Sequence, residues 1–279
     1  MKMFNKLLVL LVTVFFTGQA CKNNNSSKSP DGYDLSKPEK FVMNNDLHEI
    51  SGISFIEGKN ELYAIEDEDG KLYAIPLPSN AATKWKFGKK GDYEDVTSFN
   101  NQVFVLRSDG SIYAFPVASI GLADEVGVQE FKHLLPAGEY EGLTNADGNL
   151  YALCKDCPND KSKKEVSVYV ISGDTSGLKI SSNFKIDISS IQDKAAKEKF
   201  NPSALARHPL TKEWFVLSSV NKLLLVLDDQ WKLKASFSLD PALFNQPEGI
   251  TFNKNGDLYI SNEGGLGAGN VLLFKYAAK

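Results

Sequence analysis

A short sequence phrase that recurs five times constrains the fold of this chain more than any other feature. Its clearest copy reads EGITF at residues 248–252, and LYISNE follows after a turn at residues 258–263. Aligned on its second residue, the phrase stands at positions 52, 95, 142, 204 and 249, so that the steps are 43, 47, 62 and 45 residues. Repeats of this length, built of short alternating strands between Gly, Asn and Asp turns, are typical of a β-propeller.

The number of repeats predicts the number of blades. One repeat cannot bury its apolar face alone, and neighbouring repeats therefore pack side by side. The stretch 41–276 holds 236 residues, or about 47 per repeat, which favours five blades over the alternative of six. We therefore predict an all-β, five-bladed propeller, in which a strand around residues 41–43 joins the last blade and closes the ring.

The longest step between repeats predicts one helical insertion. Residues 188–200 are rich in Ala, Lys and Glu, which favour helices, and Ser189 or Ser190 is placed to cap the first turn. An insertion at this place accounts for the step of 62 residues.

The first 20 residues predict export. Two lysines within residues 1–6 precede ten mostly apolar residues at 7–16, and four small or polar residues follow at 17–20. This pattern is typical of a secretory signal peptide and is too short for a spanning helix, which needs about 20 apolar residues.

The residues that follow predict a lipid anchor and a tether. The sequence Gly-Gln-Ala-Cys is similar to a relaxed bacterial lipobox, in which Cys21 is lipidated, although Gly18 stands where leucine is usual. Cleavage without lipidation is the alternative. Residues 21–40 contain the lipidated cysteine and are rich in Asn, Ser, Lys and Pro, which predicts a disordered tether. Residues 41–279 are then a single propeller domain at the cell envelope, anchored to a bacterial membrane.

Charge and cysteine content limit the partners. A formal net charge of -4 gives no basic surface for nucleic acid, and we expect a monomer that binds none. Besides Cys21, the chain has Cys154 and Cys157. In an exported protein this pair favours a local disulfide, with free thiols or redox and metal chemistry as alternatives.

The repeat predicts a site at one end of the propeller axis. In a blade, the start of the first strand and the end of the second open on the same face, so five copies of each converge on a central mouth. The polar residues at the strand starts are Glu49, Glu94, Glu141, Ser203 and Glu248. Those at the ends of the second strands are Glu66, Arg107, Lys155, Ser219, Asn262 and Glu263.

Three interpretations of this acidic mouth remain open. Crowded carboxylates repel one another, so a positive charge is expected among them. It is either a hard cation such as calcium, which binds six to eight oxygen atoms, or the side chains of Arg107 and Lys155 in an internal network. Alternatively, each glutamate only caps the turn before its strand. No nucleophile elbow, zinc-binding helix motif or glycine-rich phosphate loop is present in the sequence.

Five stretches resemble the SdiA-regulated family of bacterial envelope proteins. They are EISGISF at 49–55, YEDVT at 93–97, YEGLT at 140–144, QPEGITF at 246–252 and LYISNE at 258–263, and the similarity covers residues 45–276. The resemblance implies a five-bladed propeller, distantly similar to NHL-repeat proteins, with a calcium site and no established activity. It favours four site residues, Glu94, Glu141, Glu248 and Glu263. The fourth repeat lacks the acidic residue, because it reads Asn-Pro-Ser-Ala at 201–204.

Two functions remain after these arguments. The first, which we favour, is a lipid-anchored binding protein whose mouth holds calcium and receives a small ligand or a loop of a partner protein. The second is a metal-dependent hydrolase, a lactonase or a phytase-like esterase, in which the cation activates water. Propellers host both classes, so the fold alone does not decide whether the chain is an enzyme.

Overall fold

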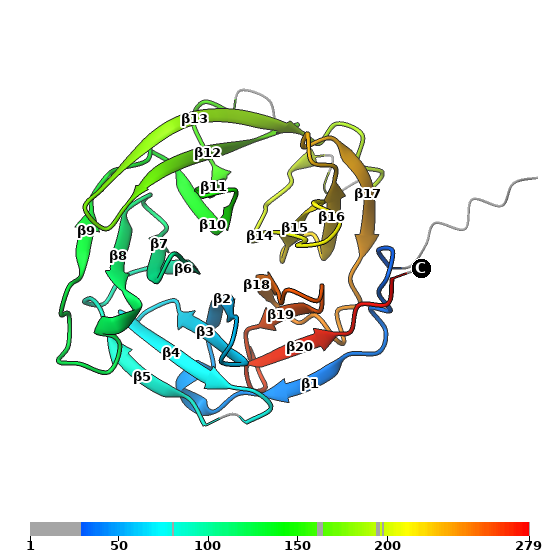
Figure 1. The fold of residues 1–279 in the computed structure, drawn as a ribbon. Helices are drawn as coiled ribbons and strands as arrows, with labels where there is room; N and C mark the ends of the chain where they lie inside the picture. The colour runs from blue at the N-terminus through cyan, green and yellow to red at the C-terminus, as the bar shows by residue number, and fades with distance from the viewer. Residues whose placement is uncertain (1–28, 80, 161–163, 194–195, 197, 279) are drawn as a thin grey trace, which may run out of the picture.

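Five four-stranded antiparallel sheets surround a central axis in the computed structural model of the chain (Figure 1). The structure describes residues 29–79, 81–160, 164–193, 196 and 198–278. The predicted five-bladed propeller is therefore confirmed, and six blades are excluded. The predicted signal peptide at 1–20 and the lipidation site Cys21 lie outside the described residues.

The strands of each blade follow one another from the axis outward. Blade 1 is β2 (Ile50–Ile56), β3 (Glu61–Glu66), β4 (Lys71–Pro76) and β5 (Thr83–Lys86). Blade 2 is β6 (Tyr93–Phe99), β7 (Gln102–Arg107), β8 (Ile112–Pro116) and β9 (Gln129–Phe131). Blade 3 is β10 (Glu139–Ala146), β11 (Asn149–Asp156), β12 (Glu165–Asp174) and β13 (Gly177–Asp187).

The last two blades complete the ring. Blade 4 is β14 (Ala204–Arg207), β15 (Trp214–Ser218), β16 (Leu223–Leu227) and β17 (Leu233–Ser238). Blade 5 is β18 (Pro247–Phe252), β19 (Leu258–Asn262), β20 (Asn270–Phe274) and β1 (Glu39–Val42). Strand β1 pairs with β20 from Glu39 opposite Leu273 to Val42 opposite Asn270. The predicted closure of the ring by an N-terminal strand is thus confirmed.

The hydrophobic core lies between neighbouring blades, in five clusters that each draw on two of them. Strand β16 buries all five of its residues because apolar side chains cover both of its faces. Trp214 and Trp231 stack with 3.8 Å between their ring centroids, and Tyr151 of blade 3 packs against both. Each blade therefore depends on its neighbours for burial, as the repeat predicted.

Residues 29–40 belong to the folded domain, so the prediction of a disordered tether was wrong for them. The Tyr33 hydroxyl donates to Gly256 O at 2.5 Å, and the Tyr33 ring contacts those of His208 and Tyr276. Leu35 is buried in the cluster between blades 4 and 5. Two apolar side chains help to fix this polar segment, because the propeller offers an aromatic surface that covers them.

Helical structure is scarce in the described part of the chain. Two short 3-10 helices are present, η1 (Asn45–Leu47) and η2 (Val117–Ser119). In the predicted insertion, residues 196 and 198 are helical, and residues 194, 195 and 197 lie outside the described residues. Asp193 Oδ1 accepts from Ala196 N at 2.8 Å, so the cap is Asp193 and not Ser189 or Ser190. None of the described helices is long and apolar enough to cross a membrane.

Candidate functional site

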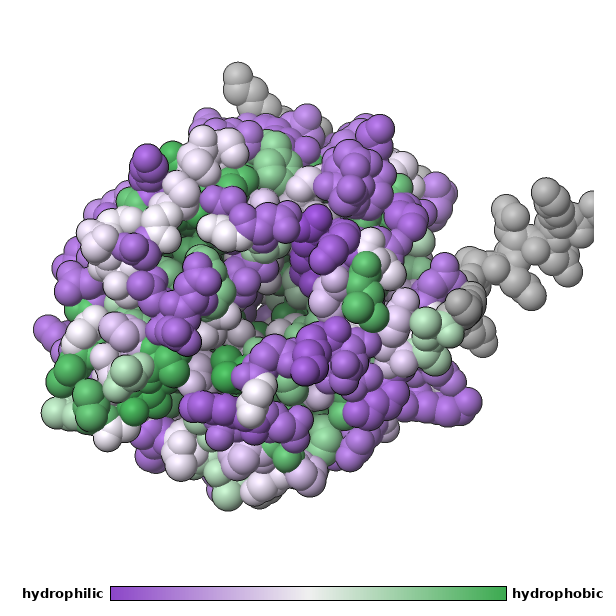
Figure 2. All heavy atoms as spheres, in the orientation of Figure 1, coloured by the Kyte–Doolittle hydropathy of each residue, from purple (hydrophilic) through white to green (hydrophobic). Residues whose placement is uncertain are grey.

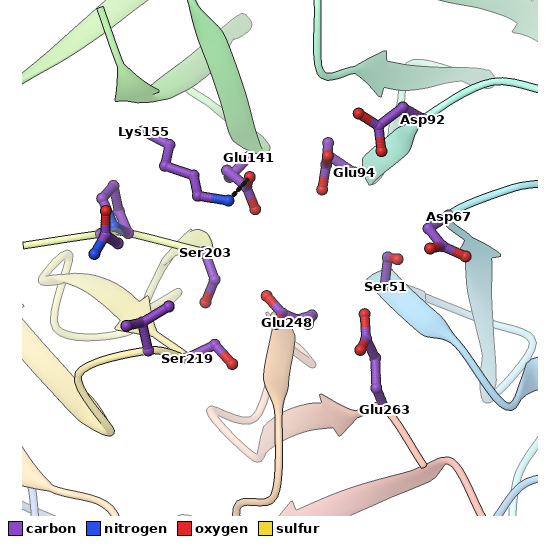
Figure 3. Close-up of a pocket in the computed structure, with 13 residues that line it drawn as sticks. Ser51, Asp67, Asp92, Glu94, Glu141, Lys155, Ser203, Ser219, Glu248 and Glu263 are labelled. Atoms are coloured by element: carbon purple, nitrogen blue, oxygen red, sulfur yellow. Dashed lines mark hydrogen bonds and ion pairs between the residues drawn. The ribbon is translucent and has the colours of Figure 1, made fainter. Parts of the chain in front are cut away.

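A polar cavity of about 200 Å³ lies at one end of the axis (Figure 3). We call it the acidic mouth, because six carboxyl groups and one ammonium group line it. Its residues are Ser51, Asp67, Asp92, Glu94, Glu141, Lys155, Asn201, Pro202, Ser203, Ser219, Val220, Glu248 and Glu263. The four predicted metal ligands are among them, together with the predicted mouth residues Lys155 and Ser219. All five blades contribute a residue.

A β-bulge at the start of the inner strand directs the repeated glutamate into the mouth. The register shifts between Tyr93 and Asp95 in β6, and the side chain inside the shift is Glu94. Strands β2, β10 and β18 shift at the same place. Bulges commonly re-aim a side chain and increase the local twist. The bulge therefore explains why residues of distant repeats point at one axis.

In blades 1, 3 and 5, a glycine follows the residue at the bulge and allows the inner strands to approach closely. A Cβ atom on Gly249 would lie 2.6 Å from Ser51 O, and one on Gly142 would lie 2.7 Å from a methyl group of Leu205. Contacts shorter than about 3.4 Å to a carbon or backbone atom are repulsive. The pair of an acidic residue and glycine thus encodes both the site and the packing of the blades around it.

Blade 2 has Asp95 where other copies have glycine. Its carboxylate accepts from Val96 N at 2.8 Å and from Leu143 N of blade 3 at 2.7 Å. The side chain is buried, and burial raises its pKa well above the usual range. Asp95 is therefore a structural bridge between two blades beneath the mouth.

At the ends of the second strands, the prediction is off by one residue in blade 1, and in blade 5 only Glu263 of the predicted pair Asn262 and Glu263 lines the cavity. Glu66, Arg107 and Asn262 pair with the first residues of their inner strands, and Cys154 holds the same place in blade 3. The side chain that enters the mouth is the next one along the chain, because successive side chains point to opposite sides. The register therefore selects Asp67, Lys155, Ser219 and Glu263. Asp67 was missed for this reason.

Arg107 lies away from the mouth, so the predicted internal network is wrong for Arg107, and Lys155 alone among the described residues neutralises a carboxylate there. Its Nη2 is 2.6 Å from Asp109 Oδ2, and its Nη1 is 3.4 Å from Glu130 Oε1. The guanidinium also lies over the ring of Tyr113, 5.8 Å from its centroid. Its charge is neutralised within its own blade.

The other predicted mouth residues have local roles. Glu66 accepts from the backbone N–H groups of Glu68 and Asp69, at 3.2 and 2.5 Å, so it caps the turn that follows its strand. Glu49 does not line the cavity, and its Oε1 lies 2.5 Å from His48 Nδ1. Asn262 is fully buried, and its amide nitrogen donates to Asn270 at 3.3 Å.

Two further polar groups at the mouth were not anticipated. Asp92 lies at the rim beside Glu94 and accepts from the Ser108 hydroxyl at 2.5 Å (Figure 3). Ser51 takes the place of the glutamate in blade 1, where the bulge points it at the axis. Asp92 precedes the repeat phrase by two residues, and no feature of the repeat marks it.

Glu94 is a carboxyl group without a partner in the part of the chain that the structure describes. Lys155 Nζ instead lies 2.5 Å from Glu141 Oε1 in the next blade. Burial, and then the charges of Glu141 and Asp92, raise the pKa of Glu94 to about 10. Glu94 therefore retains a proton at neutral pH unless a cation replaces it.

The carboxyl groups of blade 5 also have raised pKa values. Burial raises the pKa of Glu248 to about 7, although a hydrogen bond from Ser219 opposes this effect. Burial and the charge of Glu248 raise the pKa of Glu263 to about 8, and Gln246 Nε2 donates to Glu263 at 2.5 Å. Burial also raises the pKa of Asp67, whose buried Oδ1 has no hydrogen-bond partner in the structure. The mouth is thus short of positive charge.

The donors at the mouth fit a hard cation. Carboxylate, hydroxyl and amide oxygens are the ligands that calcium prefers. Among the described residues, the only group of three or more His, Cys, Asp or Glu ligand atoms within 4.8 Å of one another is that of Cys154, Cys157 and Asp160. The two cysteines form a disulfide, so they offer no thiolate. At the mouth, by contrast, the carboxyl groups are spaced more widely, and water must complete a coordination sphere unless they move inward.

The opposite end of the axis has a cavity of about 290 Å³ with a different character. The blades follow one another clockwise in Figure 1 and anticlockwise in Figure 3, so the two views are from opposite ends of the axis. Figure 2 has the orientation of Figure 1 and therefore shows this second end, with mostly hydrophilic residues around a central hollow. Several of its polar groups bridge neighbouring blades. Arg207 pairs with Asp147, Asn145 Nδ2 donates to Thr97 at 2.7 Å, and Thr251 accepts from a backbone N–H of blade 1. These bridges hold the ring together.

Comparison with known proteins gives a family and a fold. The model of the family described as SdiA-regulated matches residues 26–266. A search of curated proteins found no match. Among solved structures, glutaminyl cyclase from Myxococcus xanthus is 11% identical, with a TM-score of 0.57 over 86% of this chain and 95% of that one. A luciferin-regenerating enzyme is 11% identical, with a TM-score of 0.54 over 87% and 98% of the two chains.

A third solved structure has a similar fold. Regucalcin from Agrobacterium tumefaciens, described as a calcium-binding protein, is 10% identical, with a TM-score of 0.51 over 89% of this chain and 96% of that one. At such low identity, all three similarities establish the propeller fold alone.

Proposed function

The chain belongs to the SdiA-regulated family, and we propose that it is a lipid-anchored protein of the cell envelope whose acidic mouth binds calcium. The observation that carries the proposal is the charge of one cavity, in which six carboxyl groups meet a single ammonium group. Buried carboxylates without counter-ions are costly, and the raised pKa values of Glu94, Glu248 and Glu263 report that cost. A bound divalent cation would remove it.

Calcium suits this donor set better than magnesium. Calcium accepts six to eight oxygen ligands in a flexible geometry, whereas magnesium requires a near-ideal octahedron. Glu94, Glu141, Glu248 and Glu263 would hold the ion, and the widely spaced carboxylates favour the larger one. The calcium-binding description of the regucalcin structure, which shares the fold, agrees with this choice.

The role that we favour is binding of a small ligand or of a loop of a partner protein. Blade 4 lines the mouth with neutral groups, among them Ser203, Ser219 and Val220. The side chain of Val220 is 70% exposed at the rim, so it offers an apolar contact beside the charged groups. A ligand that bridges the cation and this neutral side would use both features.

The first residues of the chain support the proposed location. Lipidation of Cys21 would leave residues 22–28 between the membrane and the first described residue. A chain of eight steps from Cys21 to Ser29 spans at most about 30 Å. The protein would therefore stay close to the membrane as a tethered monomer.

A measurement of thermal stability tests the cation directly. We expect the melting temperature of the protein comprising residues 22–279 to rise when the chelator is replaced by millimolar calcium, because extracellular calcium modules bind with dissociation constants of roughly 10⁻⁴ to 10⁻³ M. Magnesium at the same concentration serves as the control and should give a smaller rise. The absence of any shift with calcium would refute the proposal.

A metal-dependent hydrolase is the second candidate, and the pKa of Glu248 favours it. In this alternative, Glu94, Glu141 and Glu263 would hold the ion and Glu248 would act as the base, because a carboxyl group with a pKa of about 7 is suited to accept a proton from water at neutral pH. The cation would polarise a carbonyl or phosphoryl oxygen. Hydrolysis of a lactone or a phosphate ester that requires calcium and is abolished in Glu248→Gln would establish this activity. Turnover that persists in that variant would exclude Glu248 as the base.

A further inference from the structure

Lys155 is the chemical exception in the ring of second-strand residues at the mouth. The equivalent positions in the other blades carry Asp67, Ser108, Ser219 and Glu263, which are acidic or neutral. Lys155 is the one cationic side chain among the described residues that line the cavity, and it is about one-third exposed. Its ammonium group lies 2.5 Å from Glu141, one of the four candidate calcium ligands. It therefore occupies the place of a cation.

In each blade, one residue of the second strand stands immediately before the position that faces the mouth. This residue holds the following turn in place, and we call its contact the anchor. Glu66 binds two backbone N–H groups of its turn, and Arg107 binds Asp109. Ser218 Oγ lies 2.8 Å from Asn221 Oδ1, and Asn262 binds Asn270. These four anchors are hydrogen bonds or ion pairs.

Blade 3 replaces this noncovalent anchor by a disulfide. Cys154 and Cys157 are bonded to each other, and Lys155 lies inside the loop that they close. Both cysteines are buried, and a Cβ atom on Gly138 would lie 2.7 Å from Cys157 Sγ, so the loop is packed against the residue that precedes β10. The covalent anchor thus stands under the one mouth residue that carries a positive charge.

We propose that Lys155 is a built-in competitor of the bound cation, and that the Cys154–Cys157 disulfide holds it against Glu141. This inference rests on the proposed calcium site. The ammonium group neutralises one carboxylate and repels an incoming divalent ion, so it sets a lower calcium affinity than the acidic ring would have alone. Lys155 therefore raises the calcium concentration that is needed to fill the mouth, and the disulfide positions Lys155.

Calorimetric titration with calcium chloride tests the role of Lys155. The protein comprising residues 22–279 contains every residue that the structure describes. We expect Lys155→Gln to bind calcium about tenfold more tightly than the wild type at pH 8. Lys71→Gln is the matched control, because Lys71 also forms an ion pair of 2.5 Å, with Asp69, but does not line the mouth. It should leave the affinity unchanged.

A double-mutant cycle tests the role of the disulfide. Replacement of Cys154 and Cys157 by alanine should raise the calcium affinity roughly threefold, because Lys155 then leaves Glu141 for part of the time. In the Lys155→Gln background, the same replacement should lower the melting temperature but leave the affinity unchanged. A merely structural disulfide would alter the affinity equally in both backgrounds, which would overturn its assigned role.

The outcomes separate this inference from the proposed function. If the wild type binds calcium and Lys155→Gln binds it no more tightly, the competitor role is refuted while the calcium site stands. If neither protein binds calcium at millimolar concentration, the proposed function fails, and the competitor role fails with it.

Discussion

Replacement of Glu248 by glutamine should raise stability without calcium and weaken the stabilisation that calcium provides. The folded-state pKa of Glu248 is about 7, against an ordinary value of 4.5. Below about pH 4.5 the group is protonated in both the folded and the unfolded chain, so its contribution to stability is fully present. Between about pH 4.5 and 7 the unfolded chain releases the proton first, and the free energy of unfolding falls.

The difference between these pKa values sets the magnitude. At 1.36 kcal/mol per pKa unit, ionisation of Glu248 costs the folded protein about 3 kcal/mol above pH 7. Glutamine has a similar shape and no charge, so Glu248→Gln avoids this cost. For a domain of this size, about 3 kcal/mol corresponds to a melting temperature roughly 6 to 12 °C higher at pH 8 in chelator.

Calcium should oppose the effect. A cation at the mouth stabilises the ionised carboxylate, so glutamine removes a ligand and weakens binding. Each tenfold loss of affinity removes about 1.4 kcal/mol of the stabilisation by calcium. The rise in melting temperature on addition of calcium should therefore be smaller in Glu248→Gln than in the wild type.

Thermal unfolding followed by circular dichroism at pH 5, 6, 7 and 8, in chelator and in calcium, measures both effects. Glu39→Gln is the matched control, because Glu39 is an exposed residue of the outermost strand of blade 5. A variant that is no more stable than the wild type at pH 8 in chelator would refute the raised pKa of Glu248. Equal changes in both buffers would refute the cation.

Three further changes test other parts of the argument. Asp95→Ala should lower the free energy of unfolding by about 3 kcal/mol in urea denaturation, because two buried N–H groups lose their acceptor; a loss below about 1 kcal/mol would mean that Asp95 bridges nothing. Leu35→Ala should cost about 2 to 3 kcal/mol in the same assay, since Leu35 is buried between blades 4 and 5, and an unchanged midpoint would show that the segment is not fixed there. Cys21→Ser should move the protein from the membrane fraction to the soluble fraction on cell fractionation, and continued membrane association would refute the lipid anchor.

The repeat predicted the blades and the first-strand side of the mouth because both depend on local sequence. Glu94, Glu141 and Glu248 stand at one place in a phrase that is visible by eye, and each lies in the mouth. The second-strand side was predicted less well, because a bulge shifts the pairing by one residue and thereby selects Asp67 in place of Glu66. The register of two strands depends on contacts between them, which a single strand does not display.

Composition alone did not predict the burial of the N-terminal segment. Residues 21–40 are polar on average, and an average hides the two side chains that matter. Tyr33 and Leu35 are fixed by a surface made of blades 4 and 5, which begins at Ala204, far later in the chain. Such long-range contacts enter only with the fold. In the same way, the repeat places the charge of Arg107 at the mouth, but its partners Asp109 and Glu130 hold it within blade 2.

The departures from the repeat make the distribution of charge around the mouth asymmetric. A ring of five identical units would place a cation on the axis, with equal carboxylates around it. Blade 4 instead presents Ser203 and Ser219, and in blade 3 Lys155 neutralises Glu141 (Figure 3). The uncompensated charge is therefore concentrated in blades 1, 2 and 5, where Glu94 and Glu263 have raised pKa values. A cation is drawn toward that side, and the neutral side next to blade 4 is left for whatever else enters the mouth.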